Sequence, residues 1–147
     1  MNIVFVCTGN TCRSPMAEGF MKKMFEDNAF EGDVSSRGIS VDKHSTVSLN
    51  SVQAASEFGV NIENHVPTQL CKIDIVEADY VFCVTFRHMM YVEAMYPQYK
   101  SKLHVMSDDI SDPYGCSLDV YRQSARQIYE AVKIIYEKIV GADADYI

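Results

Sequence analysis

One stretch near the N-terminus, residues 3–20, restricts the fold of this chain more than any other. It reads Ile-Val-Phe-Val-Cys-Thr-Gly-Asn-Thr-Cys-Arg-Ser-Pro-Met-Ala-Glu-Gly-Phe. The first four residues form an apolar run rich in β-branched and aromatic side chains, which is typical of a strand covered on both faces. Gly9 and Asn10 enter left-handed backbone conformations at low cost, and Ser14-Pro15 suits the first turn of a helix. The stretch therefore predicts a buried strand, a tightly curled loop and a helix.

The predicted loop has the properties of a binding site for a tetrahedral oxyanion. Cys7 and Arg13 enclose five residues whose backbone N–H groups can turn inward. The start of the following helix adds positive potential, and the Arg13 guanidinium can contact two phosphoryl oxygens at once. In this field we expect the Cys7 thiol to ionise well below its ordinary pKa of ~8.5. Cys7 is thus predicted to be a nucleophile; the alternative is a buried cysteine that only ends a strand.

The length, cysteine content and net charge of the chain exclude several classes of protein. A length of 147 residues with 48% hydrophobic content indicates a single domain, residues 1–147, with its own core. Five scattered cysteines without a Cys-x-x-Cys pair fit a reducing cytoplasm, and no apolar stretch approaches the ~18 residues of a membrane span. A formal net charge of −7 argues against nucleic acid as a partner. We expect a cytoplasmic protein, a monomer, that binds neither nucleic acid nor membrane.

Apolar patterns in the rest of the chain alternate between strands and helices. Further strands are predicted at 33–37, 80–84 and 103–106, and helices at 14–27, 46–58, 68–73, 88–95 and from Ser117 to about Ile139. Such alternation is typical of an α/β fold in which a parallel sheet with right-handed crossovers is covered by helices on both faces, a three-layer sandwich. The loop at residues 7–14 then lies at the carboxyl edge of the sheet.

The chain resembles the low-molecular-weight protein tyrosine phosphatases. The resemblance rests on Cys-Thr-Gly-Asn-Thr-Cys-Arg-Ser-Pro-Met-Ala-Glu (7–18) and Asp-Pro-Tyr (112–114), with Ser-Arg-Gly (36–38) and Ala-Asp-Tyr-Val (78–81) between them. It covers essentially the whole chain. It implies a four-stranded parallel sheet of order 2-1-3-4, with the loops at 7–14 and 107–116 on the same edge. It also implies phosphorylated proteins as substrates, and chemistry that needs no cofactor and no metal.

The expected reaction uses three residues. Cys7 attacks phosphorus to give a cysteinyl-phosphate, Arg13 holds the phosphoryl oxygens, and Asp112 protonates the leaving group and then activates water. Asp108 and Asp109 are rivals for the acid on composition alone, but the Asp-Pro-aromatic motif of the family favours Asp112. Contacts with phosphate or substrate are expected from Thr8, Gly9, Asn10, Thr11, Cys12, Arg13, Ser14 and Tyr114.

Further residues are expected to support the loop. By resemblance, the Ser14 hydroxyl donates to the thiolate, and Asn10, Ser36 and His65 brace the loop through hydrogen bonds. Without the resemblance, His65 is more often an ordinary core or surface histidine. No role is assigned to the three other histidines, which are His44, His88 and His104.

Cys12 has two interpretations. It lies five residues after Cys7 in the curled loop, which in principle allows a reversible disulfide that protects the nucleophile from irreversible oxidation. Alternatively, Cys12 is a small apolar side chain that fills space at the first turn of the helix. Cys71, Cys83 and Cys116 are interpreted as structural.

The substrate is the least constrained part of the prediction. Tyrosine-directed members of the family commonly have apolar or aromatic pocket walls, with Ile at the position of Thr11. An apolar wall would leave the N–H donors of a guanidinium unpaired, at a cost of ~1–3 kcal/mol. Thr8 and Thr11 are hydroxyl residues, and the Thr in Gly-Asn-Thr-Cys-Arg resembles the bacterial protein arginine phosphatase branch. Phosphoarginine is therefore favoured over phosphotyrosine, and Tyr114 suits either substrate as one wall.

Two other classes of function remain open. Thioredoxin-coupled arsenate reductases share a Cys-x5-Arg loop, but their relay cysteines follow the third strand, whereas here Cys83 lies within that strand and Cys116 is the next cysteine. A phosphate-binding module without catalysis would need neither Cys7 nor Asp112.

Overall fold

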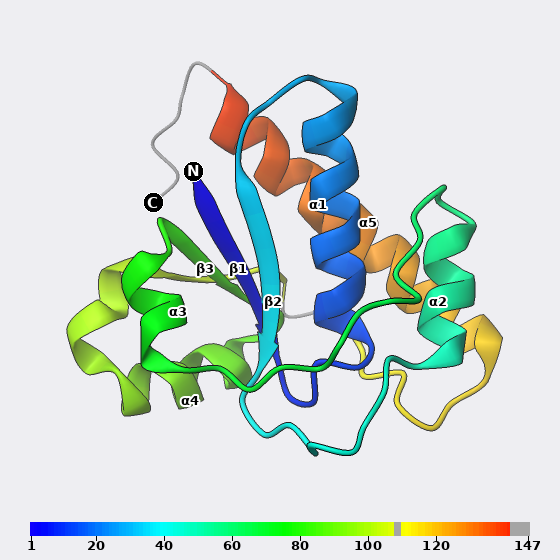
Figure 1. Ribbon diagram of the computed structural model, residues 1–147, viewed down its shortest axis with the longest axis horizontal. Coiled ribbons are helices and arrows are strands. Elements are labelled where there is room, and N and C mark those ends of the chain that lie inside the picture. The colour runs from blue at the N-terminus through cyan, green and yellow to red at the C-terminus, as the bar shows by residue number, and fades with distance from the viewer. Residues whose placement is uncertain (108–109, 142–147) are drawn as a thin grey trace.

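A four-stranded parallel sheet forms the centre of the computed structural model, which describes residues 1–107 and 110–141. The strands are β1 (Asn2–Cys7), β2 (Asp33–Gly38), β3 (Tyr80–Cys83) and β4 (Leu103–Val105), in the order β2-β1-β3-β4. β1 lies inside the sheet and pairs in parallel with both β2 and β3 (Figure 1). This order is the one that the resemblance implies, and the α/β prediction is confirmed.

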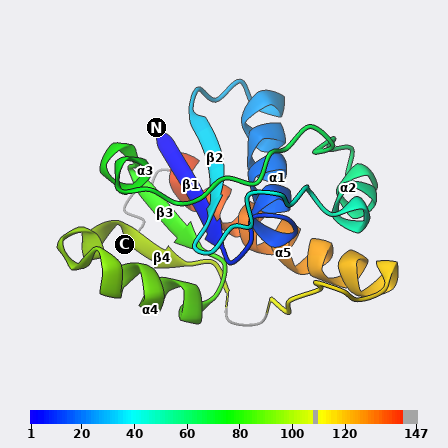
Figure 2. The same cartoon turned by 60° about the horizontal axis from the view of Figure 1, so that its bottom comes forward.

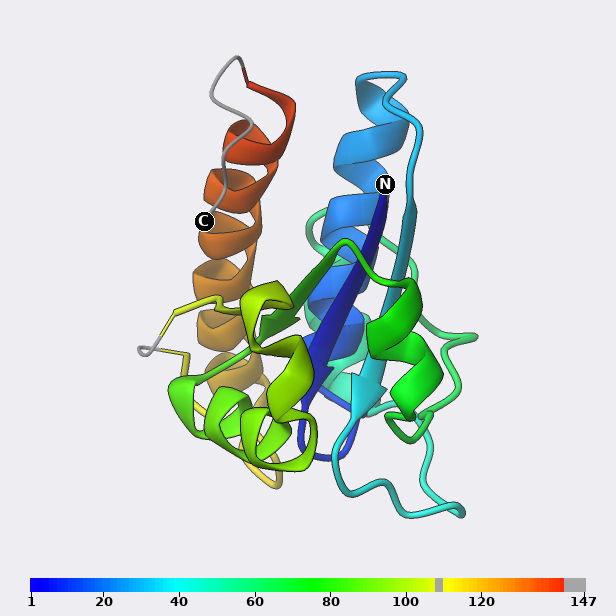
Figure 3. The ribbon, with the colours of Figure 1, turned by 90° about the vertical axis from the view of Figure 1, so that its left-hand side faces the viewer.

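Helices cover both faces of the sheet and complete the three layers. α1 (Arg13–Asp27) and α5 (Leu118–Val140) lie on one face, and α2 (Leu49–Ser56) packs against both of them. α3 (Lys72–Glu77), α4 (Phe86–Met95) and a 3-10 helix (Pro97–Lys102) lie on the other face (Figure 3). Successive residues of β1 point to opposite faces, so Phe5 joins the core beneath α1 and α5, whereas Val6 joins the core beneath α3 and α4.

The long C-terminal helix agrees with its predicted pattern. The apolar positions Tyr121, Ala125, Ile128, Val132, Ile135 and Ile139 are all buried. The opposite side of α5 is charged and exposed, as a helix on a sheet surface requires. Within the two described ranges, no helix combines the length and the apolar character needed to cross a membrane.

One predicted helix is wrong, and two have different bounds. Residues 68–70 are extended and lie along the end of β2, where Gly38 N donates to Thr68 O at 2.9 Å and Leu70 N donates to Gly38 O at 2.8 Å. These bonds with Gly38 replace those of a helix, so α3 begins only at Lys72. α2 is shorter than the predicted 46–58, and α4 begins at Phe86 because Thr85 caps it by accepting from His88 N.

The loops that follow the strands meet at the carboxyl edge of the sheet (Figure 2). The loop after β2 is tied to the loop after β1, because Ile39 N donates to Cys7 O and Ser40 N donates to Thr8 O, both at 3.0 Å. Gly38 allows this close approach, since a Cβ at that position would lie only 2.6 Å from Thr8 O. The edge therefore brings together segments that are far apart in the sequence.

Candidate active site

The loop between β1 and α1 curls around the sulfur of Cys7. Asn10 adopts a left-handed conformation with φ of 56°, and its backbone N–H donates to Cys7 Sγ at 3.3 Å. The Ser14 hydroxyl lies 2.8 Å from the same sulfur. Cys7, Arg13 and Ser14 are all buried, so the nucleophile predicted from the sequence lies at the base of the loop with donors directed toward it.

Burial raises the pKa of the Cys7 thiol above its ordinary value. Hydrogen bonds from Ser14 and Asn10 and the charge of Arg13 act in the opposite direction, but burial is the larger influence. The expectation of an unusually low pKa is therefore wrong. It counted the groups that favour the thiolate and omitted the free-energy cost of placing a charge in a buried site.

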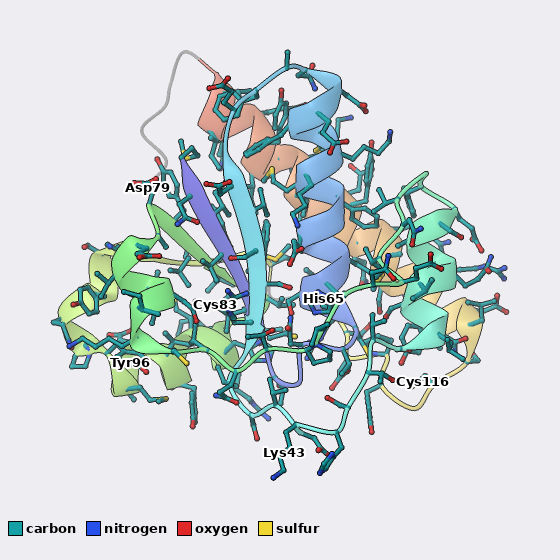
Figure 4. The ribbon with its side chains drawn as sticks, viewed as in Figure 1. Lys43, His65, Asp79, Cys83, Tyr96 and Cys116 are labelled. Carbon is teal, nitrogen blue, oxygen red and sulfur yellow. The ribbon has the colours of Figure 1, made fainter. Side chains whose placement is uncertain are left out.

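Asn10 is the centre of the network that holds the loop. Its amide nitrogen donates to Ser14 Oγ at 2.8 Å and to Ser36 Oγ at 2.9 Å. Its amide oxygen accepts from Thr68 N at 2.9 Å and lies 3.0 Å from His65 Nε2. The other two predicted bracing residues, Ser36 and His65, thus both contact Asn10, and His65 lies near the start of α1 (Figure 4). The bond from Thr68 has no sequence signal, because any residue type can supply a backbone N–H.

The loop before α5 brings a carboxylate to the same place. The Arg13 guanidinium lies 3.7 Å from Asp112 Oδ2, and its other terminal nitrogen donates to Ile110 O at 3.5 Å. Tyr114 N donates to Asp112 Oδ1 at 3.1 Å, which stabilises the Asp-Pro-Tyr turn. The rival candidates 108 and 109 lie outside the described residues.

A cavity of about 290 Å³ opens above the loop. Of the predicted site residues, Cys7, Thr8, Gly9, Thr11, Cys12, Arg13, Asp112 and Tyr114 line it. Asn10 and Ser14 are buried and do not line this cavity, and their side chains bind each other. Both residues contact Cys7 Sγ instead, Ser14 through its hydroxyl and Asn10 through its backbone N–H, and their contact with substrate stays a prediction.

One part of the cavity lining was not predicted from the sequence. It consists of Ser40, Asp42 and Ser45, from the loop after β2. Asp42 is held in place because His44 N donates to its Oδ1 at 2.9 Å. A polar run in a loop is usually only solvated, so these residues carry no signal until the path of the loop is known. Asp42 gives the cavity a second carboxylate besides Asp112.

The five cysteines are free thiols, two of which line the cavity. Cys12 is buried, and its Sγ lies 3.3 Å from the hydroxyl of Tyr121. Cys83 lies inside the sheet, where burial raises its pKa to about 12, and Cys116 lies in the loop before α5, well apart from it (Figure 4). Cys83 and Cys116 therefore do not form the relay pair of an arsenate reductase.

His88 is a neighbour of the site that the sequence analysis left without a role. It lies in the first turn of α4, and its Nε2 is 2.9 Å from Thr8 Oγ1. Its only sequence signal is its position three residues after Thr85, which fits a capped helix start.

Known proteins resemble this chain over nearly its full length. The family described as low molecular weight phosphotyrosine protein phosphatase matches residues 2–143. A protein-arginine-phosphatase of Bacillus subtilis is 30% identical over 146 residues, covering 95% of this chain and 97% of its own. The low molecular weight protein-tyrosine-phosphatase PtpB of Staphylococcus haemolyticus is 34% identical over 134 residues, covering 87% and 92%.

The fold is similar to that of solved structures as well. One is a mutant of YwlE arginine phosphatase with a phosphorylated active-site serine. It has a TM-score of 0.91 at 28% identity, with 98% of this chain and 99% of that chain covered.

Proposed function

This chain belongs to the low molecular weight phosphotyrosine protein phosphatase family, and we propose that it hydrolyses phosphoarginine in proteins in preference to phosphotyrosine. One observation carries the preference, namely the polar lining of the cavity above the Cys7 loop. Thr11, Ser40, Asp42 and Ser45 all contribute to that lining. The 30% identity with a protein-arginine-phosphatase supports the same preference.

The first step transfers the phosphoryl group to sulfur. Cys7 attacks phosphorus in line, so that an S–P bond forms while the P–N bond to the guanidinium breaks. The thiol proton passes to an oxygen of the dianionic phosphoryl group, and Asp112 gives its proton to the leaving nitrogen. Arg13 and the backbone N–H groups of the loop hold the phosphoryl oxygens through the transition state.

The second step releases inorganic phosphate. A water attacks the cysteinyl-phosphate, and Asp112, now a carboxylate, accepts a proton from it. An O–P bond forms, the S–P bond breaks, and sulfur leaves as a thiolate that hydrogen bonds from Ser14 and Asn10 N stabilise. The thiolate then takes back a proton from the released dihydrogen phosphate, which restores the thiol. One carboxyl group thus serves as acid and then as base.

Substrate preference follows from what the cavity can pair. The N–H groups of a guanidinium need acceptors, and an apolar wall would leave them unpaired. Here Thr11, Ser40 and Ser45 supply hydroxyl oxygens, and Asp42 and Asp112 supply carboxylates. A phosphotyrosine ring would instead gain from apolar walls, and among the described residues that line this cavity Tyr114 is the single aromatic one.

The preference is tested with two peptides of one sequence, carrying either phosphoarginine or phosphotyrosine. We expect a higher kcat/KM for phosphoarginine, and a shift toward phosphotyrosine in Thr11→Ile and in Asp42→Asn. Asn preserves the bond from His44 N but removes the charge. Thr46→Ile is the matched control, because Thr46 is exposed in the same loop but does not line the cavity. A wild-type preference for phosphotyrosine, or an unchanged preference in Thr11→Ile, would overturn the proposal.

A simpler assay distinguishes the proposed enzyme from a phosphate-binding module without catalysis. The proposed enzyme hydrolyses a generic aryl phosphate, and Cys7→Ser abolishes that activity. Binding of phosphate without hydrolysis by the wild type would favour the module instead.

We further propose that the protein acts in the cytoplasm on phosphorylated proteins. The reaction needs a reduced Cys7, and the free thiols fit a reducing compartment. The net charge of −7 remains an argument against nucleic acid as a partner.

A further inference from the structure

The imidazole of His88 lies between two threonines, one of which belongs to the phosphate loop. Its Nε2 is 2.9 Å from Thr8 Oγ1. On the other side of the ring, Nδ1 lies 2.9 Å from Thr85 Oγ1 and 3.2 Å from Thr85 N. The side chain is 4% exposed, so the protein supplies the partners of both ring nitrogens. The ring thus connects the start of α4 to the loop that holds Cys7.

The contact with Thr85 determines which ring nitrogen carries the hydrogen. A backbone N–H can only donate, so Nδ1 must accept from Thr85 N. Burial and the charge of Arg13 lower the pKa of His88 to about 4, so the ring is neutral at physiological pH. A neutral imidazole has one N–H. That hydrogen is therefore on Nε2, and His88 donates to the oxygen of Thr8.

The direction of the hydrogen bond from His88 determines whether the Thr8 hydroxyl can donate to a ligand. Its oxygen already accepts from His88, so its own hydrogen is free to donate elsewhere. Thr8 lines the cavity above Cys7 and also a neighbouring cavity of about 400 Å³, and Arg13 and Asp112 line both. The oxygens of an ionised phosphoryl group accept hydrogen bonds, so a hydroxyl that presented only its lone pairs would repel them.

We propose that His88 is a positioning residue, which holds the Thr8 hydroxyl as a hydrogen-bond donor to a phosphoryl oxygen bound in the loop. His88 itself does not touch the reacting atoms. The inference deepens the proposed phosphatase function, because the bound phosphoryl group is the one that Cys7 attacks. It requires no particular side chain on the substrate, so it does not depend on the preference for phosphoarginine.

A double-mutant cycle tests the coupling between His88 and Thr8. The readouts are kcat/KM for an aryl phosphate and the affinity for inorganic phosphate, which requires no turnover. His88→Leu should lower both by about threefold to tenfold, as expected for the loss of one hydrogen bond. In a Thr8→Val background, the same substitution should cause no further loss. His88→Gln should restore most of both quantities, because a glutamine amide can donate from nearly the same position.

The cycle distinguishes positioning from a general loss of packing. His104→Leu is the matched control, because His104 is a partly buried histidine on β4, in ring contact with Phe82. It should lower the melting temperature without changing phosphate affinity. Equal losses from His88→Leu in the wild type and in Thr8→Val would overturn the inference, as would ¹⁵N NMR spectra that place the hydrogen on Nδ1. Failure of phosphoarginine turnover alone would overturn only the substrate preference, since the phosphate-affinity cycle would still stand.

Discussion

The guanidinium of Arg13 and the carboxylate of Asp112 lie 3.7 Å apart, although the two residues come from opposite ends of the chain. Their side chains differ in burial: Arg13 is 7% exposed and Asp112 is 58% exposed. Arg13 thus forms part of the floor of the site, and Asp112 reaches over the cavity from its rim. A phosphoryl group bound between them would have its oxygens on the guanidinium and its leaving group toward the carboxyl group.

This arrangement predicts that Asp112→Asn lowers kcat/KM, which reports phosphoryl transfer to Cys7, by about 10²-fold or more, because an amide cannot deliver the proton that the leaving group needs. The loss should be smaller for an aryl phosphate with a very acidic leaving group, which departs without protonation. Steady-state kinetics on both substrate types measure the difference. Asp119→Asn is the control, because Asp119 pairs with Arg122 at the exposed start of α5. Equal losses for good and poor leaving groups would exclude Asp112 as the acid.

The Ser14 hydroxyl predicts a second effect, on the reactivity of Cys7. It hydrogen-bonds the sulfur and lowers the thiol pKa against the effect of burial. Ser14→Ala should therefore raise the pKa of Cys7 further. When the rate of alkylation by iodoacetate is plotted against pH, the rise in rate should occur at a higher pH in Ser14→Ala than in the wild type. Ser51→Ala is the matched control, because Ser51 is equally buried and its hydroxyl has no hydrogen-bond partner among the described residues. An unchanged alkylation profile in Ser14→Ala would contradict this role.

The parts of this site that sequence reasoning found are those carried by contiguous motifs. The Cys7 loop was recognisable because its strand, its left-handed residues and its helix start are adjacent in the chain. The partner residue Asp112 was recognisable only through the Asp-Pro-Tyr resemblance. The sheet order also depended on resemblance, since alternating strands and helices are compatible with several orders.

The parts of the site that sequence reasoning missed depend on where segments distant in the sequence meet in the fold. Asp42 lines the cavity because backbone bonds tie the loop after β2 to Thr8, and such bonds leave no side-chain pattern. His88 contacts Thr8 across 80 residues of sequence. Residues 68–70 were mistaken for a helix because their backbone partners lie on Gly38. The pKa of Cys7 was misjudged because burial is known only from the packed structure.

Burial of a neutral His88 predicts a pH-dependent stability. Its folded pKa of about 4 is below the ordinary value of 6.5, so the unfolded state takes up the proton first as the pH falls. Its contribution to stability is complete above pH 6.5 and is lost progressively as the pH falls toward 4. His88→Gln should reduce the slope of unfolding free energy against pH by up to about 1.4 kcal/mol per unit. Urea titrations across this window measure it, and an unchanged slope would contradict the assignment.

The position of Cys12 leads to a prediction for how activity responds to oxidation, because Cys12 lines the same cavity as Cys7. Peroxide should inactivate the wild type, and dithiothreitol should restore activity if a Cys7–Cys12 disulfide traps the oxidised sulfur. In Cys12→Ser, activity should not return after the same treatment. Cys116→Ser is the control, because Cys116 is exposed outside this cavity. Full recovery in Cys12→Ser would support the alternative, in which Cys12 only fills space.

The most direct measurement is the identity of the phosphorylated residue during turnover. A phosphoarginine peptide is mixed with the enzyme, the reaction is quenched with detergent at alkaline pH within one turnover, and the protein is mapped by mass spectrometry. Attack by the sulfur in the curled loop predicts one phosphoryl group, on Cys7, which appears before free phosphate and is absent in Cys7→Ala. Release of phosphate with no labelled protein, or a label on another residue, would contradict it.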